Sequence, residues 1–303
     1  MMKIARSKNR APAAGDPAVA AILDEVSTEN LRSFVNALAF PRHYFAEHKA
    51  NRQARDVLLK YATAFGYKPS LQGTYDNIVM TSPGSVGGPF LLLGAHYDSV
   101  PRTPGADDNA SAVAVCLECA RLVMKHGIGP VMIVFFNREE DGMVGSGEFV
   151  ASLAEEPGRR IGEAHVFEMV GYRDRTPGSQ KTPRGLPLPF SPNTGDFLAL
   201  LANSGSNAIA DSLVGLAARY LPGVPVLALQ VYFGIEKAFA VLNRSDHAPF
   251  WRASIPAIMW TDTAEFRNPH YHLASDTPDT LDYDFIAEVT RLALARAATV
   301  RSL

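Results

Sequence analysis

The chain has 303 residues, of which 47% are hydrophobic and 20% are charged, and its formal net charge is -2. This composition indicates a folded globular protein, and it excludes a disordered chain and a strongly basic nucleic-acid-binding protein. No apolar run approaches the roughly 18 to 20 residues that a membrane-spanning helix needs, so we expect neither a membrane nor nucleic acid as a partner.

The first 24 residues are predicted to be a loosely held tail, because they are rich in alanine, proline and charge. Asp16 interrupts the only apolar stretch that could serve as the core of a signal peptide. We therefore expect a cytoplasmic protein, or a secreted or periplasmic one if a leader has been removed.

Helical and strand patterns alternate after the tail. Ser27 or Thr28 is predicted to cap the first helix, which runs through Leu31, Phe34 and Leu38. Further helices are predicted at 52–65, 111–126, 147–153, 208–220 and 285–297, and strands at 77–81, 90–95, 131–136, 164–170, 197–202, 226–233 and 255–260. The alternation predicts one α/β domain over residues 25–303, with three layers: a mainly parallel twisted central sheet and helices on both faces.

One segment departs from this alternation. Residues 172–194 contain five prolines and show no periodicity, so they are predicted to form a long loop inside a compact domain. Long loops of this kind are typical of lids and binding walls, and the sequence leaves open whether this one is a pocket wall or a passive surface insertion.

Histidines and carboxylates gather at the ends of the predicted strands. Because ligand sites in open parallel sheets form beyond the carboxyl ends of the strands, we expect these side chains to converge. The groups are His96-Tyr97-Asp98, Asp107-Asp108-Asn109, Glu139-Glu140-Asp141, Glu168, Ser245-Asp246-His247 and His270-Tyr271-His272.

The residue types favour zinc or a similar first-row ion, because imidazole and carboxylate are its ligands. Asp98 lies two residues from His96 and is predicted to orient that imidazole from behind. Of the adjacent Glu139 and Glu140, one can bind metal while the other moves protons, as metal-assisted hydrolysis requires. Two dications, balanced by three carboxylates and one hydroxide, would leave the site near neutral.

The ordered motifs HYD, GADDNAS, NREEDG, FEMVGY, SDHAPFW and YHLASDT resemble the M28 family of co-catalytic zinc aminopeptidases. The resemblance spans roughly residues 27 to 300 and implies a zinc exopeptidase-like fold with two Zn²⁺ ions per chain. The ligands it implies are His96, Asp107, Glu140, Glu168 and His272.

The resemblance also assigns the roles of these groups. It implies that Asp107 bridges the ions, that His96 and Glu168 complete one shell, and that Glu140 and His272 complete the other. Glu139 is implied to be the general base, Asp108 a supporting group outside the metal shell, and the peptide between Asp107 and Asp108 a cis bond. The segment Ala274-Ser275-Asp276-Thr277 places the implied ligand at His272 and not at His270.

The implied activity is removal of N-terminal residues from peptides. Glu168 stands where many M28 aminopeptidases have Asp, which leaves a carboxypeptidase or deacylase specificity open. Arg244 is a candidate for binding a substrate carboxylate or carbonyl. Two roles are open for His247: helix capping together with shaping of the pocket, or direct contact with the substrate.

Other functions remain possible at this point. A glutaminyl cyclase, which binds one zinc, has the same fold and also carries a DH-x-PF motif. A non-catalytic binding protein on a peptidase scaffold is a more remote alternative. The oligomeric state and the preferred substrate residue are not indicated by the sequence.

Overall fold

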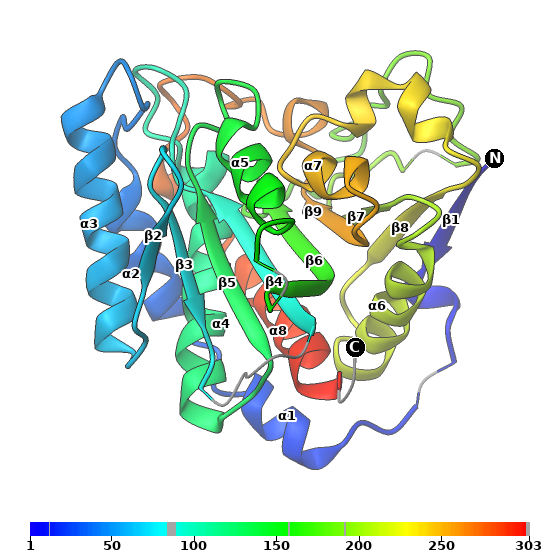
Figure 1. Ribbon diagram of the computed structural model, residues 1–303. Helices are drawn as coiled ribbons and strands as arrows, with labels where there is room; N and C mark the ends of the chain where they lie inside the picture. Colours follow the sequence, from blue (N-terminus) through cyan, green and yellow to red (C-terminus); the bar gives the residue numbers. More distant parts are fainter. Residues whose placement is uncertain (12, 84–88, 157, 191, 301–303) are drawn as a thin grey trace.

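A nine-stranded sheet forms the centre of the molecule (Figure 1). The computed structural model describes residues 1–303 except for 12, 84–88, 157, 191 and 301–303. The strands are β1 (Met2–Arg6), β2 (Ser70–Gln72), β3 (Asn77–Thr81), β4 (Pro89–His96), β5 (Val131–Phe136), β6 (Arg160–Glu168), β7 (Leu198–Ala202), β8 (Val226–Val231) and β9 (Ala257–Thr261). The helices are α1 (Pro17–Leu23), α2 (Thr28–Leu38), α3 (His48–Ala64), α4 (Ala112–His126), α5 (Val144–Ser152), α6 (Asn207–Tyr220), α7 (His247–Arg252) and α8 (Tyr283–Thr299).

The strand order is β1-β8-β7-β9-β6-β4-β5-β3-β2. The four neighbours β9, β6, β4 and β5 are parallel, so their carboxyl ends share one edge. The β7 strand is antiparallel to β9 and parallel to β8, and β1, β3 and β2 add antiparallel pairs. The single α/β domain is confirmed, with a mixed sheet whose centre is parallel.

Helices cover both faces of the sheet, and the two faces have separate cores. One core joins α1, α2, α3, α4, α6 and α8, and the other lies beneath α5 and α7 (Figure 1). Alternate residues of β5 divide between them: Ile133 and Phe135 pack in the first core, and Val134 and Phe136 in the second. A strand that is buried on both faces is therefore a continuous run of apolar residues in the sequence. No helix in the described part of the chain is both long and apolar enough to span a bilayer.

Side-chain caps fix several helix starts. The Ser27 hydroxyl accepts a hydrogen bond from the Asn30 N–H at 3.2 Å at the start of α2. Asp282 accepts from the Phe285 N–H at 2.9 Å at the start of α8. These caps satisfy backbone donors that the first helical turn leaves unpaired, and Ser27 is one of the two capping residues predicted from the sequence.

The prediction of a loosely held tail over residues 1–24 is wrong. Residues 2–6 form β1, which pairs with β8 from Met2↔Val231 to Arg6↔Leu227. The buried Ser7 hydroxyl donates to the Val224 carbonyl and accepts from the Val226 N–H, both at 3.1 Å. Val19 and Leu23 of α1 are also buried. The sequence did not indicate this order, because the partner strand β8 lies more than 200 residues from β1.

Candidate metal centre

The predicted site residues meet at the carboxyl ends of the central parallel strands. The β4 strand ends at His96, which is paired with Phe136 at the end of β5. Glu139 and Glu140 follow β5 after a tight turn in which Arg138 has a φ of 60°, and Glu168 is the last residue of β6. The strand register thus brings His96 and Glu168 to one edge of the sheet. The turn after β5 brings Glu139 and Glu140 to the same edge.

Asp108 lies between the two candidate metal-binding histidines. Its Oδ1 atom is 3.4 Å from His96 Nε2, and its Oδ2 atom is 3.1 Å from His272 Nε2. Glu168 Oε2 lies 3.4 Å from His96 Nε2, and Glu140 Oε2 lies 3.5 Å from His272 Nε2. Two donor sets result, His96/Asp108/Glu168 and His272/Asp108/Glu140, in each of which the ligand atoms lie within 4.8 Å of one another.

This geometry corrects the position implied for Asp107. The carboxylate that faces both histidines belongs to Asp108, and the cis peptide joins Asp108 to Asn109. Asp107 points away from the histidines and accepts hydrogen bonds from the Gly171 N–H at 2.8 Å and the Asn268 amide at 2.6 Å. A side-chain hydrogen bond also joins it to Asp262. Burial raises the pKa of Asp262 well above its ordinary value, and the Asp107 carboxylate adds to the shift.

Backbone contacts hold the turn that presents Asp108. The Asp276 carboxylate accepts from the Asp107 N–H at 2.8 Å and from the Asp108 N–H at 3.1 Å. The Asn109 side chain donates to the Phe167 carbonyl and accepts from the Met169 N–H. Gly105 has a φ of 62°, and a Cβ there would lie 2.4 Å from the Asp108 carbonyl oxygen. Glycine is therefore required where this turn begins.

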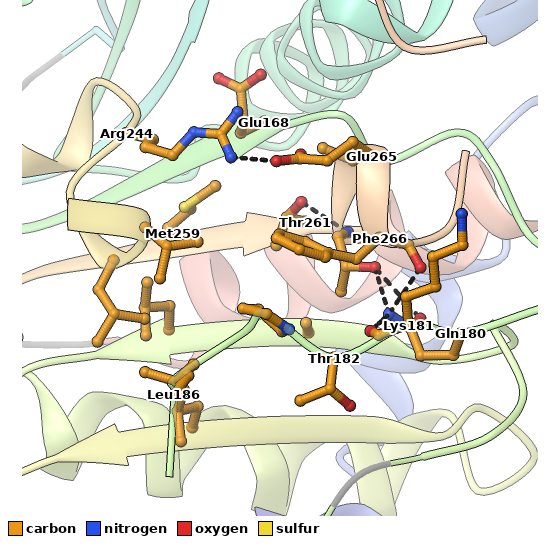
Figure 2. Close-up of a pocket in the computed structure, with 18 of the residues that line it drawn as sticks. Glu168, Gln180, Lys181, Thr182, Leu186, Arg244, Met259, Thr261, Glu265 and Phe266 are labelled. Carbon is orange, nitrogen blue, oxygen red and sulfur yellow. Dashed lines mark hydrogen bonds and ion pairs between the residues drawn. The ribbon is translucent and has the colours of Figure 1, made fainter. Parts of the chain in front are cut away.

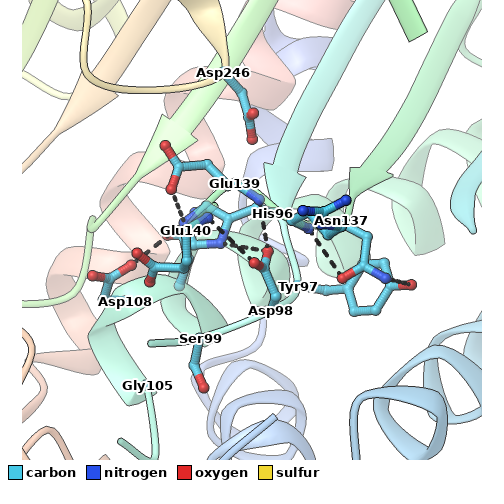
Figure 3. Close-up of polar contacts among 12 residues, drawn as sticks. His96, Tyr97, Asp98, Ser99, Gly105, Asp108, Asn137, Glu139, Glu140 and Asp246 are labelled. Carbon is cyan, nitrogen blue, oxygen red and sulfur yellow. Dashed lines mark hydrogen bonds and ion pairs between the residues drawn. The ribbon is translucent and has the colours of Figure 1, made fainter. Parts of the chain in front are cut away.

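Asp98 supports both the histidine and the glutamates. One carboxylate oxygen lies 3.3 Å from His96 Nδ1 and accepts from the Glu139 N–H at 3.1 Å. The other oxygen accepts from the Glu140 N–H at 3.3 Å. Figure 3 shows Asp98 behind His96, with Glu139, Glu140 and Asp108 on the opposite side of the ring. A carboxylate in this position orients a ligating imidazole and strengthens it as a donor.

Two residues of the SDH motif also reach this cluster. The Ser245 hydroxyl donates to Glu168 Oε2 at 2.6 Å. The Asp246 carboxyl is fully buried and accepts from the Ser146 hydroxyl, and Figure 3 shows it directed toward Glu139. Burial raises the pKa of Asp246 to about 7, in spite of the opposing effect of His96.

The electrostatics of the cluster indicate a missing positive charge. Burial raises the pKa values of Glu139 and Glu140 well above the ordinary value. The Glu168 carboxylate adds to the shift of Glu139, and the Asp108 carboxylate adds to the shift of Glu140. Burial opposes charge on His96, but the Glu168 and Asp108 carboxylates outweigh it and raise the pKa of the ring well above its usual value.

Orphaned donor atoms identify where that charge would sit. His96 Nε2, Asp108 Oδ1 and Glu140 Oε1 are buried and have no hydrogen-bond partner among the described residues. Buried polar atoms are almost always paired, and the first two of these atoms lie 3.4 Å apart. Imidazole and carboxylate donors in this arrangement fit first-row dications such as zinc.

The loop that carries His272 is fixed from beneath. Asn268 donates to Asp107 and accepts from the His270 N–H at 2.8 Å, while His272 has a φ of 57° and a 37% exposed side chain. His270 contacts the Ser275 hydroxyl and the Tyr172 ring and does not join the cluster. Of the two histidines, the structure places His272 beside Asp108 and Glu140.

A cavity opens from the cluster. Asp108, Glu139, Glu140, Glu168 and His272 lie at one end of it, and apolar side chains line the remainder. Residues of the 172–194 loop, including Leu186 and Leu188, form one wall (Figure 2). The structure thus settles the question left open for this loop, which is a pocket wall.

Arg244 lines this cavity beside Glu168 (Figure 2). Its guanidinium forms an ion pair with Glu265 and donates to the Tyr271 hydroxyl at 2.9 Å. These contacts hold its guanidinium in place among the residues that line the cavity.

His247 does not reach the cavity, so the suggestion of direct substrate contact is wrong. Its ring is fully buried, with Nε2 3.0 Å from the Leu242 carbonyl and its edge against Trp251. Burial lowers the pKa of His247 to about 4, which describes a neutral structural histidine.

Four residues near the centre had no role assigned from the sequence: Asp246, Ser245, Tyr271 and Glu265. Only Glu265 lay outside the groups that were expected to converge. The first two stand within the SDH motif and Tyr271 precedes His272, so their position in motifs was an available signal. Glu265 had no such signal, because it reaches Arg244 through a short helical turn at Ala264–Phe266.

Comparison with known proteins agrees with this geometry. Residues 77–297 match the family described as Peptidase family M28. The chain belongs to this family. An uncharacterized protein of Escherichia coli K12, YfbL, is 35% identical over 282 residues, which cover 87% of this chain and 79% of that protein. A probable leucine aminopeptidase of Trichophyton verrucosum is 26% identical over 91% of this chain and 74% of its own length. As an M28 member with relatives named aminopeptidases, the chain is a peptidase and therefore a hydrolase.

Solved structures share the fold. The Legionella pneumophila LapA aminopeptidase aligns with a TM-score of 0.75 at 22% identity, covering 97% of this chain and 77% of that one. A Bacteroides thetaiotaomicron glutaminyl cyclase aligns with a TM-score of 0.66 at 18% identity, covering 90% and 98%. A Bacillus subtilis structure described as a zinc aminopeptidase aligns at 0.54 with 24% identity, covering 72% and 48%. At these identities the alignments show the fold alone.

Proposed function

We propose that this M28 member is an aminopeptidase that uses two zinc ions to hydrolyse the first peptide bond of its substrates. The observation that carries the proposal is the pair of donor sets that share Asp108, with His96 and Glu168 on one side and His272 and Glu140 on the other. The zinc aminopeptidase of Bacillus subtilis and the relatives named aminopeptidases support the choice of metal and reaction.

The charge of the site supports two ions. Asp108, Glu140 and Glu168 bring three negative charges into the cluster, and His96 and His272 are its remaining possible metal ligands. Glu139 lies beside them. Zinc ions held by these groups would polarise the peptide carbonyl and lower the pKa of a bound water.

Glu139 is placed to move the proton. Its Oε2 atom lies 4.0 Å from His96 Nε2, and it lines the cavity. It forms a close group with His96 and Glu140 but belongs to neither of the two sets that share Asp108. The carboxylate takes the proton of the attacking water and returns it to the leaving amine. Asp98 holds the backbone of Glu139, so that the carboxylate keeps its place relative to His96.

We assign orientation of the substrate to Arg244 and Tyr271, which line the cavity. Arg244 and Tyr271 are joined by a hydrogen bond and lie beside His272 and Glu168. Their donors are available to a carbonyl or carboxylate oxygen of the substrate.

Glu139→Gln tests the assignment of the base. The variant should bind as much zinc as the wild type and lose about 10²- to 10⁴-fold in kcat. Zinc is measured by inductively coupled plasma mass spectrometry, and turnover by mass spectrometry of short peptides with and without a chelator. Glu156→Gln is the matched control, because Glu156 is an exposed partner of Arg159. A Glu139→Gln enzyme with normal turnover would remove Glu139 from the mechanism.

The same spectra separate the alternatives. Chelator-sensitive, stepwise loss of N-terminal residues supports the aminopeptidase. Loss from the C-terminus would assign a carboxypeptidase, and release of an acyl group from the N-terminus a deacylase. Cyclisation of N-terminal glutamine together with one zinc per chain would assign a glutaminyl cyclase.

A further inference from the structure

Beside the metal centre, one face of the sheet forms a largely apolar floor. Direct cross-strand pairs lead outward from the centre through Glu168↔Thr261, Thr261↔Ala199, Ala199↔Leu227 and Leu227↔Arg6. A parallel row runs through Met259↔Leu201, Leu201↔Leu229 and Leu229↔Ile4. Directly paired residues point to the same face, and all of these side chains except Arg6 line the cavity.

The length of this floor follows from the strand spacing. Adjacent strands lie about 4.8 Å apart, so the four steps from β6 to β1 span about 19 Å. An extended peptide needs five or six residues to cover that distance. No single side chain of the twenty amino acids reaches so far from its Cα, so the floor extends well beyond what one N-terminal residue fills.

The roof and the outer end are also apolar. Leu186, Leu188 and Phe190 of the 172–194 loop lie over the floor. Leu186 is 8% exposed, whereas Phe190 is 41% exposed. The Arg6 guanidinium packs 3.7 Å from the centre of the Phe190 ring, so the N-terminal strand and the loop meet where the groove ends.

The groove offers little to a peptide backbone. The floor belongs to paired strands, whose main-chain groups are satisfied within the sheet. Away from Arg244 and Tyr271, Gln180 on the rim is engaged with Thr263 and Arg267. The N–H and C=O groups of a peptide would lose water there and gain few partners, whereas an aliphatic chain has no hydrogen bonds to lose.

From this geometry we infer that the acyl side of the scissile amide carries a long, linear aliphatic chain. This chain lies in the groove that crosses the sheet from β9 to β1. The inference rests on the proposed hydrolytic function of the same site. Water attacks the acyl carbon, the C–N bond breaks, the acyl group leaves as a carboxylate and the nitrogen as an amine. The chain belongs either to a long-chain acyl group or to an N-terminal residue with a lipid-like side chain.

Two substrate series test the chain-length preference and its source. Coumarin amides of propionic, hexanoic and decanoic acid form one series, and those of alanine, 2-aminohexanoic acid and 2-aminodecanoic acid form the other. We expect kcat/KM of the zinc-loaded protein to rise by up to about fourfold per methylene, the value of a buried CH₂, through ten carbons. The series that rises identifies the source of the chain. A kcat/KM that is flat or falls beyond six carbons in both series overturns the inference and leaves the aminopeptidase standing.

A block in the groove sharpens the test. Leu229→Trp fills the floor on β8, three strands from Glu168. It should lower the ratio of the kcat/KM values for the ten- and three-carbon substrates at least about tenfold, as a filled hydrophobic subsite does. Phe233→Trp is the control, because Phe233 is 82% exposed and outside the cavity lining. An unchanged ratio in a folded Leu229→Trp protein would contradict the inference.

Binding separates this inference from the proposed function. Isothermal titration calorimetry with hexanoate, decanoate and tetradecanoate measures occupation of the groove without turnover. Tighter binding of the longer acids, weakened by Leu229→Trp, supports the groove even if no amide is hydrolysed. Hydrolysis of short amides without any chain-length dependence in affinity rejects the groove and keeps the peptidase.

Discussion

The two halves of the sheet contribute to the site in different ways. In the parallel half, β4, β5 and β6 supply residues from their carboxyl ends, where His96, Glu139, Glu140 and Glu168 converge. In the other half, β7, β8 and β1 supply residues from one face, where Leu201, Leu229 and Ile4 stand in register. Strand ends thus position polar groups, and strand faces position apolar ones.

The difference has a physical origin. A parallel strand end opens directly into a turn, so polar side chains there reach the cavity without breaking the sheet's hydrogen bonds. A strand face alternates its side chains between two sides, so it forms a smooth apolar surface whose length is set by the number of strands. Each half can be altered without rebuilding the other, which makes the comparison testable.

The largest expected effect comes from Asp108→Asn in the polar half. Asp108 is the carboxylate common to both donor sets, so its replacement should reduce bound zinc below two ions per chain and abolish measurable turnover. Metal content and peptide hydrolysis are measured on the same preparation.

Asp107→Asn is the matched comparison, since it changes the neighbouring carboxylate by the same single atom. Asp107 accepts from Gly171 and Asn268 behind the centre, so this variant should keep both ions and lose thermal stability. Loss of zinc from Asp107→Asn with full occupancy in Asp108→Asn would reverse the assignment made here.

The sequence predicted the elements with strong local signals. The strand at 131–136 was located to the residue, because both of its faces are buried and its apolar run is unbroken. The start of α2 followed from Ser27, whose hydroxyl caps it. The site motifs were recognisable because they stand at strand ends, where histidines and acidic residues interrupt apolar runs.

Other features depend on contacts that no local pattern records. Asp107 and Asp108 are identical in type, and their directions follow from the turn held by Asp276, which is almost 170 residues away. The β1 strand exists because β8 provides a partner, and the role of the 172–194 loop appears only once Leu186 meets the sheet. Distance along the chain thus separates what could be predicted from what could not.

Asp98→Asn should have a smaller effect in the polar half. Asn cannot accept equally from both glutamate N–H groups, so His96, Glu139 and Glu140 lose their shared support. Replacing a group that orients a metal ligand costs about 10- to 100-fold in metal affinity or activity. Zinc titration against a competing chelator measures the first and kcat/KM the second.

Asp141→Asn is the control for Asp98→Asn. Asp141 lies in the loop after β5 that carries Glu139 and Glu140, but its carboxylate pairs with Arg138 and His43 and with none of the proposed ligands. If Asp141→Asn weakened zinc binding as much as Asp98→Asn, the effect would belong to the loop as a whole and not to the carboxylate behind His96.

The smallest effect on catalysis is expected from Glu163, five residues before Glu168 on β6. Glu163 Oε1 lies 3.0 Å from His165 Nε2, and its carboxylate pairs with Arg296 of α8. Burial opposes its charge, but these two partners outweigh burial and lower the pKa of Glu163 to about 2. Every polar atom of this cluster is engaged, in contrast to the orphaned atoms at the metal centre, so its role is structural.

The sign of the pH dependence follows from that shift. A carboxyl group whose pKa is lower in the folded state stabilises the fold above its unfolded pKa of 4.5, and that contribution is lost as the pH falls toward about 2. Glu163→Gln should lower the free energy of unfolding at pH 7 by an amount on the order of 3 kcal/mol, with kcat per bound zinc unchanged. Urea unfolding at pH 7, 5, 4 and 3 should show the difference from wild type shrinking at the two lowest values. A constant difference at all four pH values would mean that the loss comes from packing, and reduced turnover would mean that Glu163 is coupled to the metal centre along β6.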